Sequence, residues 1–502
     1  MNAAPILVLQ MQRMGDLVLS FPLLARLAAL YPEHPIWVVG ERAFYEPLLD
    51  LSPRAVYFSY EAAPGLKRNS YRLILNLSHR QKAARLAGSL ESGEVLGPII
   101  DKSGRLFIRG DWQIYRASLT DNNRYNLFHW ADLNCLDLMR PKLMLRTVWT
   151  EVRPALGQGA RIGLFLGASQ PEKHPDAAFW TSLCRSLLTR GFRPALLGGR
   201  AEADLGRTVA AAIEAPALNL CGRFSVGELA AFLGRLDLLV TPDTGPMHVA
   251  AWIGTPCLNL SLGPVNAWET GPFAPGHLVL RAALDCAGCW QCTREAQFCR
   301  EKMNAQAVAA IVAALCMGRD AKEAGPDLDL SRTRRDSFGL FDLVALHSPA
   351  SPARADLDAN PKSGAAAQND VRMALARFWQ RWFMAAFAYA DQEAMLAAAS
   401  VLGRDYPAEA ARLAAAAAAF ALRLAKDAKF GRPGFAENPE SWRAFDPVFQ
   451  PFSGYAQMYA QNEGRHPAAR RRLLDMAESL ASLFVGGQPD GAGKGICPVP
   501  EV

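Results

Sequence analysis

The chain has 502 residues, of which 50% are hydrophobic and 20% are charged, a balance that excludes a disordered or fibrous protein. Lysine and arginine number 54 against 48 acidic residues, and the net charge of +6 is spread along the chain, so no basic block predicts a nucleic-acid partner. A chain of this length exceeds what one hydrophobic core supports, which predicts two Rossmann-sized units and a smaller part.

The apolar run near the N-terminus is not typical of a signal peptide or a membrane span. No basic segment precedes it, and Gly15 and Asp16 interrupt it. The chain contains 10 cysteines, and long enzymes with clustered cysteines usually occupy reducing compartments. We therefore expect a cytoplasmic protein, with peripheral contact at the cytoplasmic membrane face left open.

Strand-length apolar runs alternate with helical patterns through the first 317 residues, as is typical of βαβ units in a mostly parallel sheet. The clearest early strands are expected at residues 6–10, 36–39 and 71–77. The alternation then fades until a new strand begins at Arg161, which predicts a boundary near residue 155. The expected fold class is α/β, with Rossmann-like lobes at residues 1–155 and 156–318.

Two segments of different character follow the second lobe. Residues 319–370 are rich in Pro, Ser, Asp and Ala, which predicts a partly disordered linker. Residues 371–502 contain strong helix formers with apolar faces, which predicts an α-helical domain. No motif in that domain indicates its role.

Gly15 and Asp16 follow the first predicted strand, where active-site residues of open α/β sheets gather. Glycine lets the backbone approach a ligand closely, and a carboxylate in the crevice accepts a proton from an attacking hydroxyl. The sequence therefore predicts a general base at Asp16. The alternative is that Asp16 only caps the following helix.

Residues 237–264 have the order strand, tight loop, short helix and strand, which is how phosphate sites are built. Thr244 offers a hydroxyl and Gly245 an unobstructed N–H, while Pro246 suits the first helical position. The positive helix end would then stabilise a departing diphosphate. His248 is either a donor to a phosphate oxygen or a structural histidine.

Two further strand ends carry polar residues suited to a nucleotide. Ser169 and Lys173 follow the strand that begins at Arg161, and a hydroxyl and a point charge both suit phosphate. Glu202 follows a Gly-Gly turn, where a carboxylate holds a ribose hydroxyl or caps a helix. The G-x-G-x-x-G pattern is absent here, which disfavours a nicotinamide or flavin cofactor.

Four of these segments read MQRMGDLVLSFPLL, GASQPEKHPDAAFW, LLGGRAEADL and VTPDTGPMHVAAWIGTPCLNLSLGP. Through them the chain resembles glycosyltransferase family 9, the lipopolysaccharide heptosyltransferases, over residues 5–317. The resemblance implies the GT-B fold, ADP-heptose as the nucleotide-sugar donor, and the lipopolysaccharide inner core or a related glycan or glycolipid as acceptor. It also implies an inverting displacement at the anomeric carbon that requires no metal or other cofactor.

The resemblance also implies roles for single residues. Asp16 corresponds to the catalytic base, and the donor-site positions are Lys173, Glu202, Asp243, Thr244, Gly245 and His248. The segment YRLILNLSHRQKAA departs from the family pattern, so the acceptor is not fixed by it. Candidate acceptor residues are Arg13, Gly15, His79 and Arg80, with surface ion pairs as the alternative for the arginines.

Cys286, Cys289, Cys292 and Cys299 follow the last strand as C-x2-C-x2-C-x6-C. Four thiolates suit tetrahedral zinc or an iron–sulfur cluster, so a structural metal is predicted over free thiols.

Two other function classes stay open beside the transferase. One is a catalytically degenerate nucleotide- or glycan-binding scaffold, and the other, disfavoured one is a nucleotide-dependent dehydrogenase or epimerase.

Overall fold

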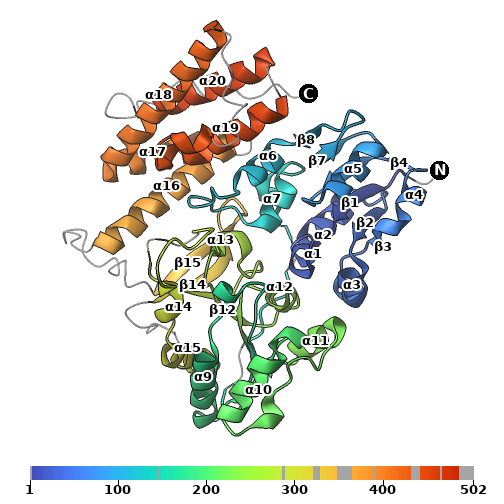
Figure 1. Cartoon of the computed structure of the whole chain (residues 1–502), viewed down its shortest axis with the longest axis vertical. Coiled ribbons are helices and arrows are strands. Elements are labelled where there is room, and N and C mark those ends of the chain that lie inside the picture. Colours follow the sequence, from blue (N-terminus) through green and yellow to red (C-terminus); the bar gives the residue numbers. More distant parts are fainter. Residues whose placement is uncertain are drawn as a thin grey trace.

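The computed structural model describes residues 3–484, except for residues 145, 148, 155–156, 285, 287–288, 320–327, 348–363, 388–391, 431–440 and 464–465. Two sheets with helices on their faces form the first part of the chain, and a group of helices follows (Figure 1). The α/β class with a helical C-terminal region is therefore confirmed.

The first sheet is parallel except at one edge, where β8 runs antiparallel to β7. Its strands lie in the order β3 (Val56–Phe58), β2 (Ile36–Gly40), β1 (Ile6–Gln10), β5 (Leu73–Asn76), β7 (Val95–Ile100) and β8 (Leu106–Arg109). A separate small sheet pairs β4 (Ser70–Tyr71) with β6 (Glu91–Ser92). Every residue of β1 is buried, as is typical of a strand covered on both faces.

The helices of the first lobe are α1 (Met14–Val18), α2 (Phe21–Leu30), α3 (Arg42–Tyr45), α4 (Ala63–Leu66), α5 (Gln81–Ser89), α6 (Asp111–Ser118), α7 (Trp130–Leu136) and α8 (Pro141–Met144). The carboxyl end of β1 leads almost directly into α1. Gly15 and Asp16 therefore lie at the carboxyl edge of the first sheet, inside a short helix rather than in the turn before one.

The second sheet runs β10 (Arg193–Leu197), β9 (Arg161–Phe165), β11 (Leu238–Pro242), β12 (Cys257–Leu260), β13 (Leu278–Ala282), β14 (Leu328–Arg335) and β15 (Phe341–His347). Its helices are α9 (Ala177–Thr189), α10 (Ala203–Ala212), α11 (Val226–Leu233), α12 (Gly245–Trp252), α13 (Ala267–Thr270), α14 (Phe298–Glu301) and α15 (Ala305–Cys316). The Asp-Thr-Gly segment joins β11 to α12, so it too lies at a carboxyl strand edge.

The hairpin of β14 and β15 corrects the linker expected at residues 319–370. Its strands add to the second sheet by antiparallel pairing with β13 and with each other. Leu330 and Phe341 are fully buried, and Asp342 accepts from Arg334 at 2.9 Å, so the charged residues of this stretch are paired rather than solvated. Composition predicted a linker because it did not register the apolar residues that alternate with these charges.

The rest of the expected linker divides in two. Residues 320–327 and 348–363 lie outside the described residues, so the structure does not test the disorder expected there. The remainder, from Gly364, already belongs to α16.

The C-terminal helices are α16 (Gly364–Ala386), α17 (Gln392–Asp405), α18 (Pro407–Phe430), α19 (Gln450–Glu463) and α20 (Pro467–Ser482). They pack beside α6 of the first lobe (Figure 1) and share its hydrophobic core. The rings of Tyr115 and Phe383 lie 4.6 Å apart between centroids, and Arg472 binds Asp111 at 2.6 Å. Within the described residues, no helix combines the length and apolar character needed to span a membrane.

Candidate functional site

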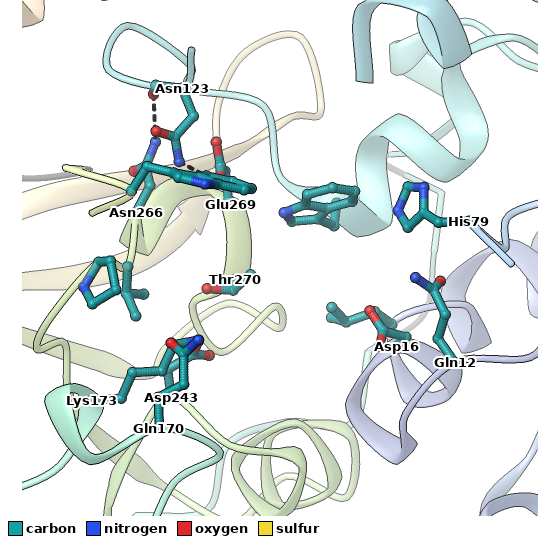
Figure 2. Close-up of a pocket in the computed structure, with 15 residues that line it drawn as sticks. Gln12, Asp16, His79, Asn123, Gln170, Lys173, Asp243, Asn266, Glu269 and Thr270 are labelled. Atoms are coloured by element: carbon teal, nitrogen blue, oxygen red, sulfur yellow. Dashed lines mark hydrogen bonds and ion pairs between the residues drawn. The ribbon is translucent and has the colours of Figure 1, made fainter. Parts of the chain in front are cut away.

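A cavity of about 390 Å³ lies where the two sheets face each other. It is lined by Gln12, Asp16, Leu19, His79, Asn123, Trp130, Gln170, Lys173, Asp243, Pro264, Val265, Asn266, Glu269, Thr270 and Trp290. Figure 2 shows Asp16, Gln12 and His79 on one side and Lys173, Asp243 and Gln170 on the other. Of the residues singled out in the sequence, Asp16, His79, Lys173 and Asp243 therefore share one cavity.

Asp16 caps the start of α1, which is the alternative considered for it, and also lines the cavity. One carboxylate oxygen, Oδ2, accepts from the backbone N–H of Arg13 at 3.2 Å, which caps the start of α1. The side-chain amide of Gln10 donates to the backbone carbonyl of Asp16 at 3.3 Å and so also holds the turn. The carboxylate lines the cavity while it caps the helix, so its orientation in the cavity is held by the backbone.

The opposite side of the cavity carries a buried charge cluster. Lys173 Nζ donates to Asp243 Oδ2 at 3.4 Å, and His248 Nε2 lies 3.9 Å from Asp243 Oδ1. Burial lowers the pKa of His248, although the Asp243 carboxylate opposes this shift. The imidazole is therefore neutral at neutral pH, and its Nδ1 has no partner among the described residues.

The start of α12 has the geometry of an anion site. Thr244 is its N-cap and accepts from the backbone N–H of Met247 at 3.4 Å, while Gly245 and Pro246 form the first helical positions. Gly245 also lets the lobes meet, because a Cβ there would lie 2.6 Å from Met14 Cε. A Cβ on Gly15 would lie 3.1 Å from His248 Cδ2. These two glycines therefore permit direct contact between α1 and α12.

The other sequence candidates lie outside the cavity wall. Ser169 is exposed, and Glu202 accepts from the backbone N–H of Gly199 at 2.7 Å, which is the capping role considered for it. Arg13 is exposed, and Arg80 pairs with Glu41, which is the surface ion pair considered for the arginines. None of these four residues is labelled in Figure 2, which draws the residues that line the cavity.

Several cavity residues carried no sequence signal. Trp130 begins α7, and Asn123 lies in the loop before it. Glu269 and Asn266 lie at α13, in a segment for which the sequence analysis made no prediction. None belongs to a recognised motif, and only the tertiary fold brings them to the cavity. The available hint was position alone, because the segment with Asn266 and Glu269 follows the carboxyl end of β12, where site residues of such sheets gather.

The four clustered cysteines line a second, small cavity together with Gly263 and Arg281. The backbone N–H of Gly263 donates to Cys299 Sγ at 3.4 Å. Burial raises the pKa of Cys289 to about 11, and the neighbouring thiols act in the same direction. Among the described residues, no group of three or more His, Cys, Asp or Glu side chains has an arrangement that could hold a metal ion.

Comparison with known proteins gives a family match and several relatives. The family model described as glycosyltransferase family 9 (heptosyltransferase) matches residues 62–298. Lipopolysaccharide heptosyltransferase 1 of Pseudomonas aeruginosa is 30% identical over 177 residues, covering 32% of this chain and 49% of the relative. Lipopolysaccharide heptosyltransferase 2 of Escherichia coli is 27% identical over 135 residues, covering 26% and 36%.

Among solved structures, E. coli ADP-heptose lps heptosyltransferase II has a TM-score of 0.47 at 20% identity, covering 62% of this chain and 99% of that one. The chain spans about half the length, or less, of the curated relatives it matches. The matched segment begins after Asp16 and includes His79, Lys173, Asp243 and Glu269 of the cavity wall. The matched region, residues 62–298, is therefore similar to glycosyltransferase family 9.

Proposed function

We propose that the protein transfers a sugar from a nucleotide-sugar donor to a glycan hydroxyl, by inversion at the anomeric carbon and without a catalytic metal. One observation carries the proposal: Asp16 of the first lobe and the Lys173–Asp243 pair of the second line the same cavity. A carboxylate that faces an anion site across a cavity suits a displacement in which a base deprotonates the acceptor and a diphosphate leaves.

In the proposed reaction the second lobe holds the donor. The pyrophosphate lies at the start of α12, where Thr244, Gly245 and the helix dipole face it, and Lys173 contributes a positive charge. Negative charge grows on the diphosphate as the glycosidic bond breaks, so these fixed groups stabilise the transition state more than the ground state. Neutral His248 lies beside this turn, with its Nε2 at 3.9 Å from Asp243 Oδ1.

In the first lobe, Asp16 accepts the proton of the attacking hydroxyl. The oxygen then forms a bond to the anomeric carbon while the bond to the diphosphate breaks on the opposite face. Since Asp16 Oδ2 also accepts from the N–H of Arg13, the other oxygen is the one offered to the acceptor. His79 and Trp130 line the same side and are suited to contact the acceptor sugar.

The donor is proposed to be ADP-heptose and the acceptor a lipopolysaccharide-core or related glycolipid at the membrane face. The support is that the curated relatives are named lipopolysaccharide heptosyltransferases. A thermal-shift panel of ADP-, GDP- and UDP-sugars tests the donor, because a ligand at 100 times its Kd stabilises the fold by about 2.7 kcal/mol. Transfer to glycolipid in vesicles, compared with transfer to the soluble glycan, tests the membrane contact.

Replacing Asp16 with Asn tests the base. We expect kcat to fall by about 10²- to 10⁴-fold, while nucleotide affinity changes little because the variant leaves the second lobe intact. Asp50→Asn, on an exposed position of the first lobe, is the matched control. Transfer by Asp16→Asn at the parental rate would exclude the assigned base. Nucleotide binding by the parent without turnover on any acceptor would favour a degenerate scaffold.

The cysteine cluster is proposed to bind a structural zinc ion or iron–sulfur cluster that takes no part in the transfer. The support is that Cys286, Cys289, Cys292 and Cys299 line one cavity. Its thiols would have to reorient on binding, since the described side chains do not form a ligand set. Metal analysis of protein purified without oxygen, with neither zinc nor iron found, would exclude this proposal.

A further inference from the structure

Glu269 is a second buried carboxylate in the cavity wall, and the proposed reaction does not use it. It lies on α13 of the second lobe and is 4% exposed. Its Oε2 accepts from Asn123 Nδ2 at 3.0 Å, and its Oε1 accepts from Asn126 Nδ2 at 2.9 Å. Both asparagines belong to the first lobe, so these bonds cross between the lobes. Within the described residues Glu269 forms no ion pair.

Asn266 of the second lobe adds hydrogen bonds in which the second lobe donates and the first lobe accepts. Its Nδ2 donates to the backbone carbonyls of Asn123 at 3.2 Å and of Asn126 at 3.0 Å. Its Oδ1 accepts from the backbone N–H of Trp268 and so caps α13. We call Asn123, Asn126, Asn266 and Glu269 the interlobe clasp. All four residues are buried, with Asn123 and Asn126 each 2% exposed and Asn266 and Glu269 each 4% exposed.

The clasp forms part of the cavity wall. Asn123, Asn266 and Glu269 line the cavity, and Figure 2 shows them together, above Lys173 and Asp243 and away from Asp16. The lobes also touch elsewhere, for example where α1 meets α12 at Gly15 and where the indole N–H of Trp252 donates to the backbone carbonyl of Leu51 at 2.8 Å. The clasp differs from these contacts in that three of its four residues line the cavity, so a change in the clasp acts directly on the cavity wall.

Burying the Glu269 carboxylate costs free energy, so this contact forms only where specific partners satisfy the carboxylate. Burial raises the pKa of Glu269 to about 7, against the amide hydrogen bonds that favour the ionised form. A charge at this depth is retained only where its hydrogen bonds are satisfied. Tyr115 of α6 faces the carboxylate through Asn126, to whose Oδ1 its phenol donates at 2.9 Å.

Other charged groups near the clasp either contact Trp268, the residue before Glu269, or lie across the cavity. Arg281 of β13 and Arg372 of α16 lie over the ring of Trp268, at 4.8 Å and 5.7 Å. Asp16 and Lys173 line the facing walls. None of these groups replaces the amides as a partner of the carboxylate among the described residues.

We propose that Glu269 is a positioning residue for sugar transfer: its carboxylate holds the Asn123–Asn126 segment against α13 and so fixes the separation between Asp16 and the Lys173–Asp243 pair. The proposal rests on the proposed function for its effect on rate, but the clasp itself is a property of the fold. Groups that react across a cavity lose about 10²-fold in rate for about 1 Å of misplacement, so a loosened clasp is costly.

A donor–acceptor exchange tests the clasp. Glu269→Gln places an amide N–H₂ against that of Asn123, and Asn123→Asp places two carboxylates together. The double variant Glu269→Gln/Asn123→Asp restores one carboxylate and one amide in reversed order, with the Gln oxygen still accepting from Asn126. We expect each single variant to lose about 10-fold in kcat, and the double variant to recover to within about 3-fold of the parent.

Three readouts accompany the rate. Nucleotide affinity should stay unchanged, because the nucleotide groups belong to the second lobe. Amide hydrogen exchange of residues 121–128 and 266–270 should accelerate in both single variants and return in the double variant. In the parent, kcat should fall as pH decreases through about 7, where Glu269 gains a proton, and this limb should be absent in Glu269→Gln.

The outcomes separate the clasp from the proposed function. Parental kcat and parental exchange in both single variants overturn the clasp, as does a double variant no better than the worse single one. If the parent transfers no sugar from any donor, the proposed function fails and the exchange data alone decide on the clasp. If Glu269→Gln does not fold, the comparison of Asn123→Asp with the double variant gives the same decision.

Discussion

Replacing Arg335 with methionine tests how the β14–β15 hairpin is held against the first lobe. Arg335 Nη1 donates to Asp132 Oδ1 at 2.8 Å, and the backbone N–H of Phe341 donates to Asp132 Oδ2 at 2.8 Å. Asp132 is fully buried in α7, and the Arg335 side chain is 7% exposed and lies 3.8 Å from the ring centroid of Phe273. The variant leaves a buried carboxylate without its cation.

The size of the loss follows from that carboxylate. Burial raises the pKa of Asp132, and Arg335 opposes the shift. Without Arg335 the native state avoids the buried charge by binding a proton. Protonating a carboxyl costs about 1.4 kcal/mol for each pH unit above its free pKa of about 3.9. At pH 7 the free energy of unfolding of the variant is therefore lower by about 4 kcal/mol. Arg26 also lowers the pKa of Asp132, so about 4 kcal/mol is the upper value.

The sign of the pH dependence is fixed by the same reasoning. The native variant holds a proton that the unfolded chain releases, so its free energy of unfolding should fall as pH rises, by up to about 1.4 kcal/mol per unit between pH 4 and 7. Urea unfolding followed by tryptophan fluorescence at several pH values measures this slope relative to the parent. The control is Asp132→Asn/Arg335→Met, which has no buried charge and should show no added slope. Parental stability of Arg335→Met at pH 7, within about 1 kcal/mol, would refute the reasoning.

Three further substitutions address the cavity directly. Gly15→Ala should lower kcat by about 10-fold, because its Cβ would lie 3.1 Å from His248 Cδ2 and displace Asp16 with α1. The control is Gly65→Ala, whose Cβ meets nothing within 4 Å and which should keep the parental kcat. The same kcat in Gly15→Ala and Gly65→Ala would contradict the close contact. Lys173→Met should raise the Kd for ADP by about 10- to 100-fold in calorimetry, since a charge-assisted hydrogen bond contributes about 1.5–3 kcal/mol, and an unchanged Kd would place the nucleotide elsewhere. His248→Gln should leave the pH dependence of ADP affinity unchanged between about pH 7 and 8, because burial lowers the pKa of His248. A slope that is lost in the variant would show a charged imidazole in the parent.

The parts of the site that lie next to strand ends were predictable from the sequence. Asp16 follows β1, Lys173 follows β9 and Asp243 follows β11, and all three line one cavity. The reason is geometric, because parallel strands bring their carboxyl ends to one edge, and two facing sheets place those edges together. Local pattern therefore brings a polar residue to the sheet edge, but Ser169 and Glu202, which also follow strands and lie outside the cavity wall, show that it does not decide which of these residues line the cavity.

The clasp and the hairpin were not predictable, for two different reasons. Asn123 lies in a loop and Glu269 in the short helix α13, 146 positions apart, and their pairing depends on how the lobes dock, which no local pattern encodes. The hairpin had a local signal in the alternation of Leu328 and Leu330 with polar residues. Its prediction as part of a linker followed from the composition of the longer window, which outweighed that short alternation.

The helical C-terminal region is structurally part of the first lobe rather than an appendage to it. Trp112 of α6 is fully buried and lies 5.0 Å from Phe387 between ring centroids, and Tyr115 contacts Phe383 in the same way. Removing the C-terminal helices would expose these rings to water and unpack α6. That helix also carries Arg116, whose guanidinium lies 4.5 Å from the ring of Trp130 in the cavity wall.

Arg116 connects this packing to the proposed chemistry. Its guanidinium is buried, which lowers its pKa to about 10, and the charge of Asp16 opposes that shift. The arginine is therefore held as a cation near the proposed base, and the position of that cation depends on α6. Because α6 is fixed on its other side by the C-terminal helices, for example through the bond from Arg472 to Asp111, the electrostatic environment of Asp16 depends on residues far beyond the family 9 match. Tests of the proposed transfer consequently require the full chain.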